Sequence, residues 1–222
     1  MVSIRQEFSG RPSEVRQPAR LWYAAYGSNM HPERLARYLR GGTPPGGRRA
    51  HPGCRDPRPP ERAVPVMLRG LVYFATESDV WGGGRAFYDP DAPDEEAPAH
   101  AYLVSRGQFS DIAAQEMGRL PGDDLDLSGV LRSGRARFGP GRYETLVRAG
   151  TLDGLPVLTF TAPRPFRSRA LPPNAPSAAY LRHLGAGLMA SHGWDAARAA
   201  AYLASRPGAR EVWTPEAIAE LL

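Results

Sequence analysis

An abrupt change from an apolar run to a Gly-Ser-Asn turn constrains the fold of this chain more than any other feature. Residues 21–26 are apolar and aromatic, which predicts a buried strand, and Gly27, Ser28 and Asn29 follow directly. A short helix is predicted over residues 31–39, with Ser28 or Asn29 available to cap it. A strand, a tight turn and a helix in this order point several backbone N–H groups at one spot, which favours a negative charge there. Many capped turns of this kind bind nothing, so an anion site and an idle turn both remain open here.

The composition argues against nucleic acid as a partner. The 222 residues are 42% hydrophobic and 23% charged, which is typical of a globular chain that buries a full core. The formal net charge is +5, and all 28 basic residues are arginine. The absence of lysine, together with only two asparagines (Asn29 and Asn174), indicates the codon bias of a GC-rich bacterial genome. The arginines are scattered and form no stripe with aromatic residues, so we expect no nucleic-acid partner.

Cysteine and histidine usage predicts no metal site. The single cysteine, Cys54, excludes an internal disulfide and lies in a Pro/Gly/Arg-rich stretch with no base beside it, so no nucleophilic role is expected. The histidines (31, 51, 100, 183 and 192) are dispersed and lack zinc-site spacing.

No apolar run of the sequence approaches the length that spans a membrane, and the first residues are charged where a signal peptide is apolar. We therefore expect a cytoplasmic protein without membrane contact, as a monomer or a homodimer.

The order of elements predicts an α+β fold, with a small mixed barrel-like sheet, a central helix and C-terminal helices. A single domain is expected over residues 20–222, after a flexible arm at 1–19. Strands are predicted at residues 21–26, 64–75 (one strand or a bulged pair), 86–88, 99–104, 130–138, 144–149 and 155–161. Helices are predicted at residues 31–39, 105–118, 177–191, 195–205 and 215–222. Long loops are expected at 40–62 and 119–142, the second interrupted by the strand at 130–138.

Three other polar clusters predict little specific chemistry. Asp123, Asp124 and Asp126 lack the spacing of a metal-binding loop and indicate a solvated turn. The glycines at 82–84 are short of a nucleotide motif, because no Lys-Ser/Thr follows them and no helix opens there. Ser28 does not lie in a Gly-x-Ser-x-Gly sequence, so a serine hydrolase is poorly supported.

Glu116 is a candidate proton carrier at the end of the helix predicted over residues 105–118. Most helical glutamates lie on the surface. A carboxyl at a helix C-terminus, however, faces the negative end of the helix dipole, which tends to raise the pKa of such a group. A carboxyl of this kind in a partly apolar setting is suited to accept and return a proton near neutral pH. The pattern makes Glu116 a candidate without selecting it over the other glutamates.

Several separated segments resemble, in order, the gamma-glutamylcyclotransferase-like family. The first is Tyr26-Gly27-Ser28-Asn29, with Met30 where the family usually has Leu. The others are Trp81-Gly82-Gly83-Gly84, Gln115-Glu116-Met117-Gly118 around the family's catalytic Glu, Gly141-Arg142-Tyr143, Pro176-Ser177 with Tyr180, and Gly185-Ala186. Together they cover residues 21–203.

The resemblance implies a cofactor-independent enzyme, an amide-bond lyase or acyltransferase acting on a gamma-glutamyl or similar aminoacyl amide. The substrate's own α-amine would attack its γ-carbonyl and release 5-oxoproline and a free amine. Glu116 would be the general acid/base. The residues implied to bind this small anionic substrate are Tyr26, Gly27, Ser28, Asn29, Met30, Gly83, Gly84, Arg85, Tyr143 and Tyr180.

The chain also departs from the family pattern. Residues 120–140 are inserted between Glu116 and Tyr143, the segment 40–62 is long and Arg-rich, and Arg85 follows the glycine turn. These differences suggest a leaving amine other than that of the commonest substrates. Two alternatives stay open: an amide hydrolase or deacylase in which Glu116 activates water, and a non-catalytic protein that binds an anionic metabolite.

Overall fold

The computed structural model describes residues 17–42, 50–168 and 170–222. The chain divides into two compact, interleaved units. The first contains the described residues up to Ala24 together with 33–66 and 101–163, and the second contains 25–32, 67–100 and the described residues from 164 onward. The single domain expected over 20–222 stays a prediction, and the expected arm lies, for residues 1–16, outside the described residues.

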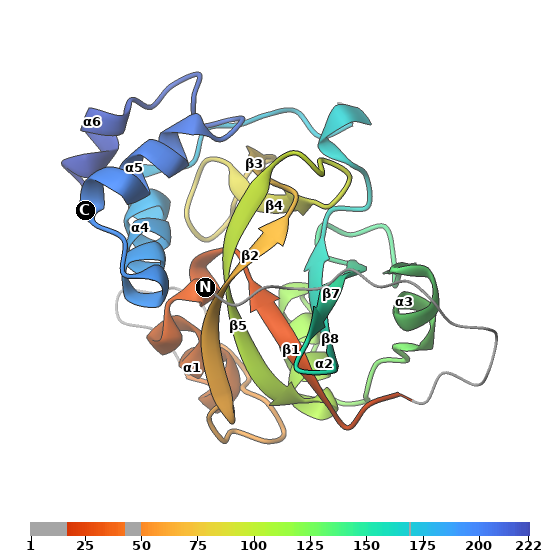
Figure 1. Ribbon diagram of the computed structural model, residues 1–222. Coiled ribbons are helices and arrows are strands. Elements are labelled where there is room, and N and C mark those ends of the chain that lie inside the picture. The colour runs from red at the N-terminus through yellow and green to blue at the C-terminus, as the bar shows by residue number, and fades with distance from the viewer. Residues whose placement is uncertain (1–16, 43–49, 169) are drawn as a thin grey trace. The chain divides into compact units, whose positions relative to one another are not determined.

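A six-stranded mixed sheet has the order β2-β5-β1-β8-β7-β6 (Figure 1). Its strands are β1 (Arg20–Ala25), β2 (Arg62–Arg69), β5 (Glu96–Ser105), β6 (Arg135–Arg137), β7 (Thr145–Leu152) and β8 (Leu155–Thr161). β1 pairs in parallel with β8, with Trp22 opposite Val157, whereas β7 is antiparallel to both β6 and β8. Within the described ranges the order ends at β2 and β6, so this is an open sheet.

The hairpin of β7 and β8 confirms the strands predicted at 144–149 and 155–161. Its two turn residues, Asp153 and Gly154, have φ angles of 50° and 74°. Positive φ at both central positions is the signature of a type I′ turn, whose twist matches that of the flanking strands. Asp followed by Gly is a preferred pair for this turn, so the sequence alone locates it.

Helix α2 (Arg106–Glu116) confirms the predicted central helix and contacts β1 and β8 through aromatic side chains. Ser105 is its N-cap, with the Ser105 hydroxyl accepting from the Gln108 N–H and the Gln108 side chain accepting from the Ser105 N–H, both at 3.1 Å. The ring of Phe109 lies 6.0 Å from that of Tyr23 and 6.4 Å from that of Phe160, centroid to centroid. These aromatic contacts fix the face that α2 turns to the core.

The strand predicted at 130–138 is wrong for its first half and confirmed only for residues 135–137. Residues of this segment form helix α3 (Ser128–Ser133) and only then the short strand β6. The Asp126 carboxylate accepts from the Ser128 N–H at 2.9 Å, and Gly134, with φ of 77°, ends the helix. Val130 is fully buried, but local side-chain-to-backbone bonds decide the conformation here rather than its β propensity. The expected loop at 119–142 therefore contains a helix and a strand.

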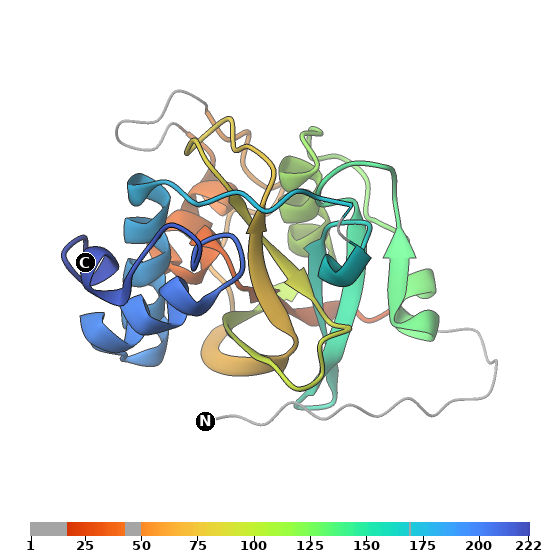
Figure 2. The same cartoon turned by 90° about the horizontal axis from the view of Figure 1, so that it is seen from above.

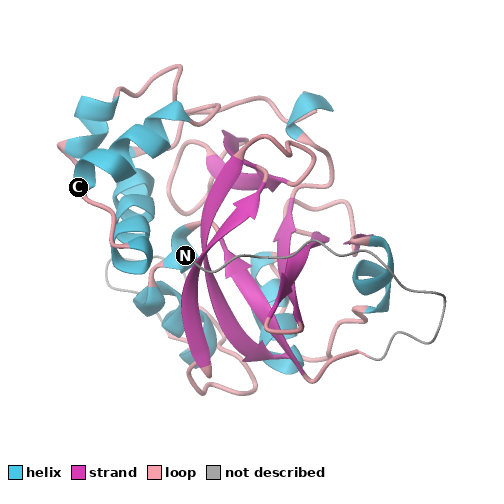
Figure 3. Cartoon of the chain, viewed as in Figure 1, coloured by secondary structure: helices cyan, strands magenta, loops and turns pink. Residues whose placement is uncertain are grey.

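The second unit contains the hairpin of β3 (Leu71–Ala75) and β4 (Arg85–Asp89) and the helices α4 (Ala178–His192), α5 (Ala196–Ser205) and α6 (Pro215–Ala219). The C-terminal helices, cyan in Figure 3, confirm those predicted at 177–191, 195–205 and 215–222, and α5 lies beside both α4 and α6 (Figure 2). The segment predicted at 64–75 is two strands, separated at Gly70, where a Cβ would come within 2.5 Å of the Tyr88 ring. The α+β class with a mixed sheet, a central helix and C-terminal helices is thus confirmed.

The helices in the described part of the chain are all too short or too polar to cross a bilayer.

Candidate functional site

The turn after β1, in the second unit, is a single turn of 3-10 helix, η1 (Ser28–Met30). The Met30 N–H donates to the Gly27 carbonyl at 2.9 Å, and the His31 N–H donates to the Ser28 carbonyl at 3.3 Å. Helix α1 (Pro32–Arg40) begins three residues after Asn29, so the predicted capping by Ser28 or Asn29 is wrong. The first N–H groups of such a turn have no partner within it, which favours an anion.

This turn is held by buried contacts of its own unit. Asn29 and Met30 are buried, and the Nδ1–H of His100 donates to the Met30 carbonyl at 3.0 Å. Burial lowers the pKa of His100, so its ring is neutral at neutral pH and serves as a hydrogen-bond donor. A Cβ at Gly187 of α4 would lie 3.0 Å from the Met30 Cβ, so a larger residue there would push on Met30 and the close approach of α4 favours glycine. The contacts of His100 and α4 with Met30 therefore hold the backbone that follows Gly27 in place.

Tyr180 lies beside the same turn, as the sequence predicted. It is buried in the first turn of α4, and its hydroxyl is 3.5 Å from the position of a Cβ on Gly27. The Trp81 ring stacks on Tyr180, with a centroid distance of 5.6 Å and an angle of 15°, and the exposed ring of His183 lies 4.4 Å from Trp81. Tyr26, also buried, packs against the Tyr88 ring at 5.7 Å. The structure brings Tyr26, Gly27 and Tyr180 together within one unit.

The glycines at 82–84 form a turn in which hydrogen bonds and close packing account for Gly83 and Gly84. The Gly83 N–H donates to the Glu77 carboxylate at 2.8 Å, and the Gly84 N–H donates to the Ala175 carbonyl at 2.7 Å. A Cβ on Gly84 would come within 1.9 Å of the Asn174 carbonyl oxygen, so close approach of the chain requires glycine. The Arg85 side chain, 12% exposed, donates to the Glu77 carbonyl and lies 3.7 Å from the Asp79 carboxylate. The substrate contacts assigned to Gly83, Gly84 and Arg85 stay predictions.

Glu116 is half-buried and is the last residue of α2, as predicted, in the first unit. Its side chain is hydrogen-bonded to the hydroxyl of Tyr38, a buried residue of α1. Burial, and next the negative charge of Glu116, raise the pKa of Tyr38 well above its usual range. Tyr38 therefore keeps its proton and donates to the carboxylate. The sequence analysis missed Tyr38, because Leu35, Tyr38 and Leu39 follow helical core spacing and indicate packing only.

Tyr143 follows a tight turn tied to the end of α2, also in the first unit. The buried carboxylate of Glu144 accepts from the Gly141 N–H and from the guanidinium of Arg119, which lies three residues after Glu116. Tyr143 itself is half-buried, with its ring edge-on to Phe160 at 6.0 Å. Arg119 and Glu144 were missed, although Gly139 and Gly141 signal them. A Cβ at these positions would come within 2.3 and 2.6 Å of the Glu144 carboxylate.

Cys54 serves the fold. Its thiol donates to the Tyr38 carbonyl at 3.4 Å, and burial raises its pKa to about 12. The thiol is therefore protonated at neutral pH, in line with the prediction that it is no nucleophile. Among the residues that the structure describes, no three His, Cys, Asp or Glu side chains are placed to hold a metal ion.

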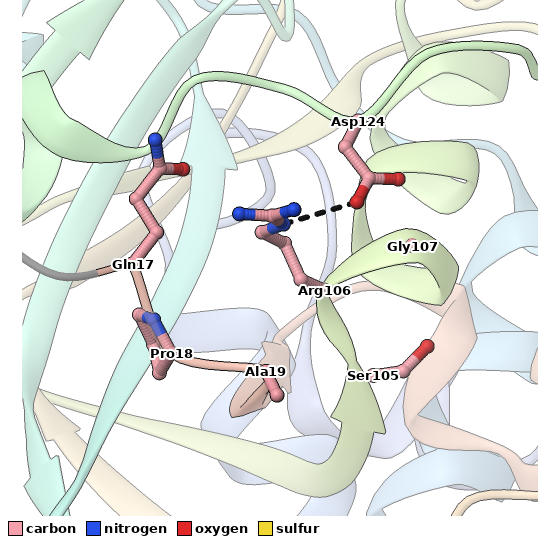
Figure 4. A pocket seen from close by; sticks show the side chains of 7 residues that line it. All are labelled: Gln17, Pro18, Ala19, Ser105, Arg106, Gly107 and Asp124. Carbon is pink, nitrogen blue, oxygen red and sulfur yellow. Dashed lines mark hydrogen bonds and ion pairs between the residues drawn. The ribbon is translucent and has the colours of Figure 1, made fainter.

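A pocket of about 610 Å³ lies at the start of α2, at the other end from Glu116 (Figure 4). Its lining residues are Gln17, Pro18, Ala19, Ser105, Arg106, Gly107 and Asp124. Asp124 is exposed, in line with the predicted solvated turn, and it is also bonded to Arg106 at 3.0 Å and to Arg55 at 2.7 Å, which the sequence did not predict. The Arg55 hydrogen bond, followed by that of Arg106, lowers the pKa of Asp124. The two charged residues that line the pocket, Arg106 and Asp124, are thus paired with each other.

Comparisons with known proteins find a curated relative and several solved structures. The relative is histone deacetylase 5 of Arabidopsis thaliana, with 31% identity over an alignment of 198 positions that covers 82% of this chain and 30% of that protein's length. A structure titled gamma-glutamyl cyclotransferase and one of an uncharacterized protein from Homo sapiens each match 78% of this chain. They match over 80% and 81% of their own chains respectively, both with a TM-score of 0.45 and 16% identity. No family model matches the chain.

Proposed function

We propose that this chain is a cyclotransferase-type enzyme that converts a gamma-glutamyl amide into 5-oxoproline and a free amine. The observation that carries the proposal is the state of Glu116, which ends α2 half-buried and receives a hydrogen bond from the protonated Tyr38. A general base has to be held in one orientation and to keep a carboxylate oxygen able to take a proton. The ordered motifs around Gly27, Glu116, Tyr143 and Tyr180 support the same reaction.

The chemistry needs one proton carrier. Glu116 takes a proton from the substrate's α-ammonium group, and the free amine attacks the γ-carbonyl carbon. A C–N bond forms within the five-membered ring, and the original amide C–N bond breaks. Glu116 then returns this proton to the leaving amine. The ring nitrogen loses a second proton, which the regenerated carboxylate passes on to the leaving amine, so that the amine departs as an ammonium ion, substrate atoms are conserved and no water enters. Holding the amine near the carbonyl supplies much of the rate, because the attack is intramolecular.

For the turn in the second unit we propose a binding role. The N–H groups at Gly27, Ser28 and Asn29, at the start of η1, suit a carboxylate or a developing oxyanion. The Tyr180 hydroxyl beside Gly27 is a further donor, with Tyr26 and Met30 as apolar contacts. In the first unit, the half-buried ring of Tyr143 is proposed as a substrate contact.

The test is release of 5-oxoproline from a panel of gamma-glutamyl amines. We expect the wild type to release it and Glu116→Gln to do so at least about 100-fold more slowly, because general acid–base catalysis contributes factors of this size. Glu220→Gln, which changes an exposed glutamate directly after the last helix, is the matched control. Equal rates in wild type and Glu116→Gln would remove Glu116 from the mechanism.

A second candidate function is amide hydrolysis. The observation that favours it is the name of the relative, a histone deacetylase, since deacetylation hydrolyses an amide; the chain spans about 30% of that protein's length. Glu116 would then activate water rather than the substrate's amine. Turnover in ¹⁸O-labelled water separates the two reactions, because hydrolysis places one ¹⁸O in the acid product and cyclisation places none.

A further inference from the structure

The end of α2 is hydrogen-bonded to one residue of α1, Tyr38, at two points. The Gln115 side-chain amide donates to the Tyr38 carbonyl at 3.0 Å, and the Tyr38 hydroxyl bonds to the side chain of Glu116. Two consecutive residues of α2 are thus bonded to the backbone and to the side chain of the same tyrosine. Such a double attachment fixes the direction of the Glu116 carboxyl as well as its distance from α1.

Tyr38 is itself held firmly. It is 7% exposed, and its carbonyl, in the last turn of α1, also accepts from the Cys54 thiol at 3.4 Å. Its ring lies 4.3 Å from the ring of His51, and the Arg34 guanidinium lies 5.8 Å from its centroid. A side chain packed on this many sides has little rotational freedom left, so its hydroxyl is a fixed donor.

We propose that Tyr38 is the positioning residue for Glu116, orienting the carboxylate and stabilising its ionised form by one hydrogen bond. The inference rests on the proposed function, in which Glu116 is the general base. Tyr38 does not touch the reacting atoms in this scheme and acts only through Glu116. A hydrogen bond to the charged form of a carboxyl favours that form, so the bond keeps Glu116 ready to accept a proton.

The informative variant is Tyr38→Phe, which keeps the ring and removes one oxygen. Within the first unit, the other groups that act electrostatically on the Tyr38 hydroxyl are Arg34 and Tyr23, and both stay in place. The matched control is Tyr202→Phe. It also removes a buried hydroxyl, but among the described residues that hydroxyl has no hydrogen-bond partner.

Two measurements decide the proposal. The first is kcat and KM with a gamma-glutamyl amide, and the second is the ¹³C NMR titration of glutamate carboxyls, with Glu116 assigned from Glu116→Gln. We expect Tyr38→Phe to lower kcat about 10-fold with KM within about twofold, because a charge-assisted hydrogen bond is lost. We also expect its Glu116 signal to titrate at a higher pH than in the wild type. Tyr202→Phe should match the wild type in both measurements, and melting curves should show all three proteins folded.

Unchanged kcat and an unchanged Glu116 titration in Tyr38→Phe would overturn the proposal. A raised KM with unchanged kcat would overturn it too, since Tyr38 would then shape binding. If the wild type releases no 5-oxoproline from any gamma-glutamyl amide, the proposed function fails. The titration then decides the role of Tyr38 on its own, because it requires no turnover.

Discussion

The two ends of α2 carry charged groups in opposite arrangements. At its start, Asp124 is bonded to Arg106 beside an open pocket (Figure 4). Asp124 is also bonded to Arg55. At the end of α2, about 16 Å away at 1.5 Å per residue, Glu116 is held by the neutral hydroxyl of Tyr38. An ion pair neutralises a carboxylate, whereas a phenol orients it and leaves its charge. The pocket therefore lies beside ion pairs that hold the chain together, and the candidate general base lies at the opposite end of α2.

The helix dipole sharpens the contrast. A carboxylate at the N-terminal end is stabilised by the partial positive charge of the first turn, and one at the C-terminal end is destabilised by the carbonyls of the last turn. Asp124 thus gains stability from its position, whereas the last turn of the helix gives Glu116 no such gain. Changes at the start of α2 should alter stability alone, and changes at its end should alter turnover alone.

The largest effect is expected when the carboxyl at each end of α2 is replaced by an amide, in two separate variants. Glu116→Gln should lower kcat at least about 100-fold and leave the free energy of unfolding within about 0.5 kcal/mol, because its loss removes the proton carrier but little packing. Asp124→Asn should keep kcat within about twofold. Steady-state rates and urea denaturation on both proteins check this. Similar losses of kcat in both variants would end the distinction between the two ends.

Asp111→Ala should lower the free energy of unfolding by about 2 kcal/mol. Asp111, 1% exposed, accepts from the Arg55 N–H at 2.8 Å and from its guanidinium at 3.0 and 3.1 Å, which ties the segment around Cys54 to α2. Urea denaturation gives the change, with the exposed Asp94→Ala as control. A kcat that falls together with stability, measured on fully folded protein, would contradict a purely structural role.

Ser105→Ala should lower the free energy of unfolding by about 1 kcal/mol, because it removes the hydroxyl that accepts from the Gln108 N–H at 3.1 Å. Ser105→Asp keeps an acceptor and adds a favourable charge at the helix start, so it should retain the wild-type stability. Denaturation midpoints of the three proteins are the measurement. The comparison would be weakened if Ser105→Asp were as unstable as Ser105→Ala.

The smallest effect concerns pH. Because the pKa of Asp124 is lowered in the folded state, its contribution is fully present above its unfolded pKa of about 3.9 and is lost as the pH falls through the lower folded value. The side chain is 32% exposed, so the contribution is about 0.5 kcal/mol. The stability difference between wild type and Asp124→Asn should be constant from pH 7 to about pH 5 and should shrink below about pH 4. A difference that grows on acidification would contradict this sign.

Local patterns predicted most of the elements. The apolar run at 21–26 is β1, the helix predicted at 105–118 is α2, and the strands predicted at 144–149 and 155–161 form the β7–β8 hairpin, because each signal acts between residues close in sequence. The strand expected at 130–138 is helical in its first part. The hydrogen bond from the Ser128 N–H to the Asp126 carboxylate lies at the start of α3, before the residues whose pattern suggested a strand. Short apolar segments do not distinguish a helix from a strand by pattern alone.

The candidate site was predicted only in part. Glu116, Tyr143 and Tyr180 were identified by motif, and the structure places Tyr180 beside Gly27 in one unit. Tyr38, Arg119 and Glu144 were missed, because their partners lie far from them in the sequence. Tyr38 bonds to Glu116, and Arg119 bonds to Glu144 on the other side of the inserted residues. Their side chains look like core or surface residues until the partner is known.

The sequence by itself located most of the strands and helices, and it placed Glu116 at a helix terminus, because capping, turn chemistry and periodicity are properties of adjacent residues. The tertiary structure decided which groups meet. It set a neutral phenol against Glu116, paired Asp124 with two arginines, and gave the glycines at 83 and 84 a packing role. These outcomes depend on burial and on contacts between distant segments, which no local pattern encodes.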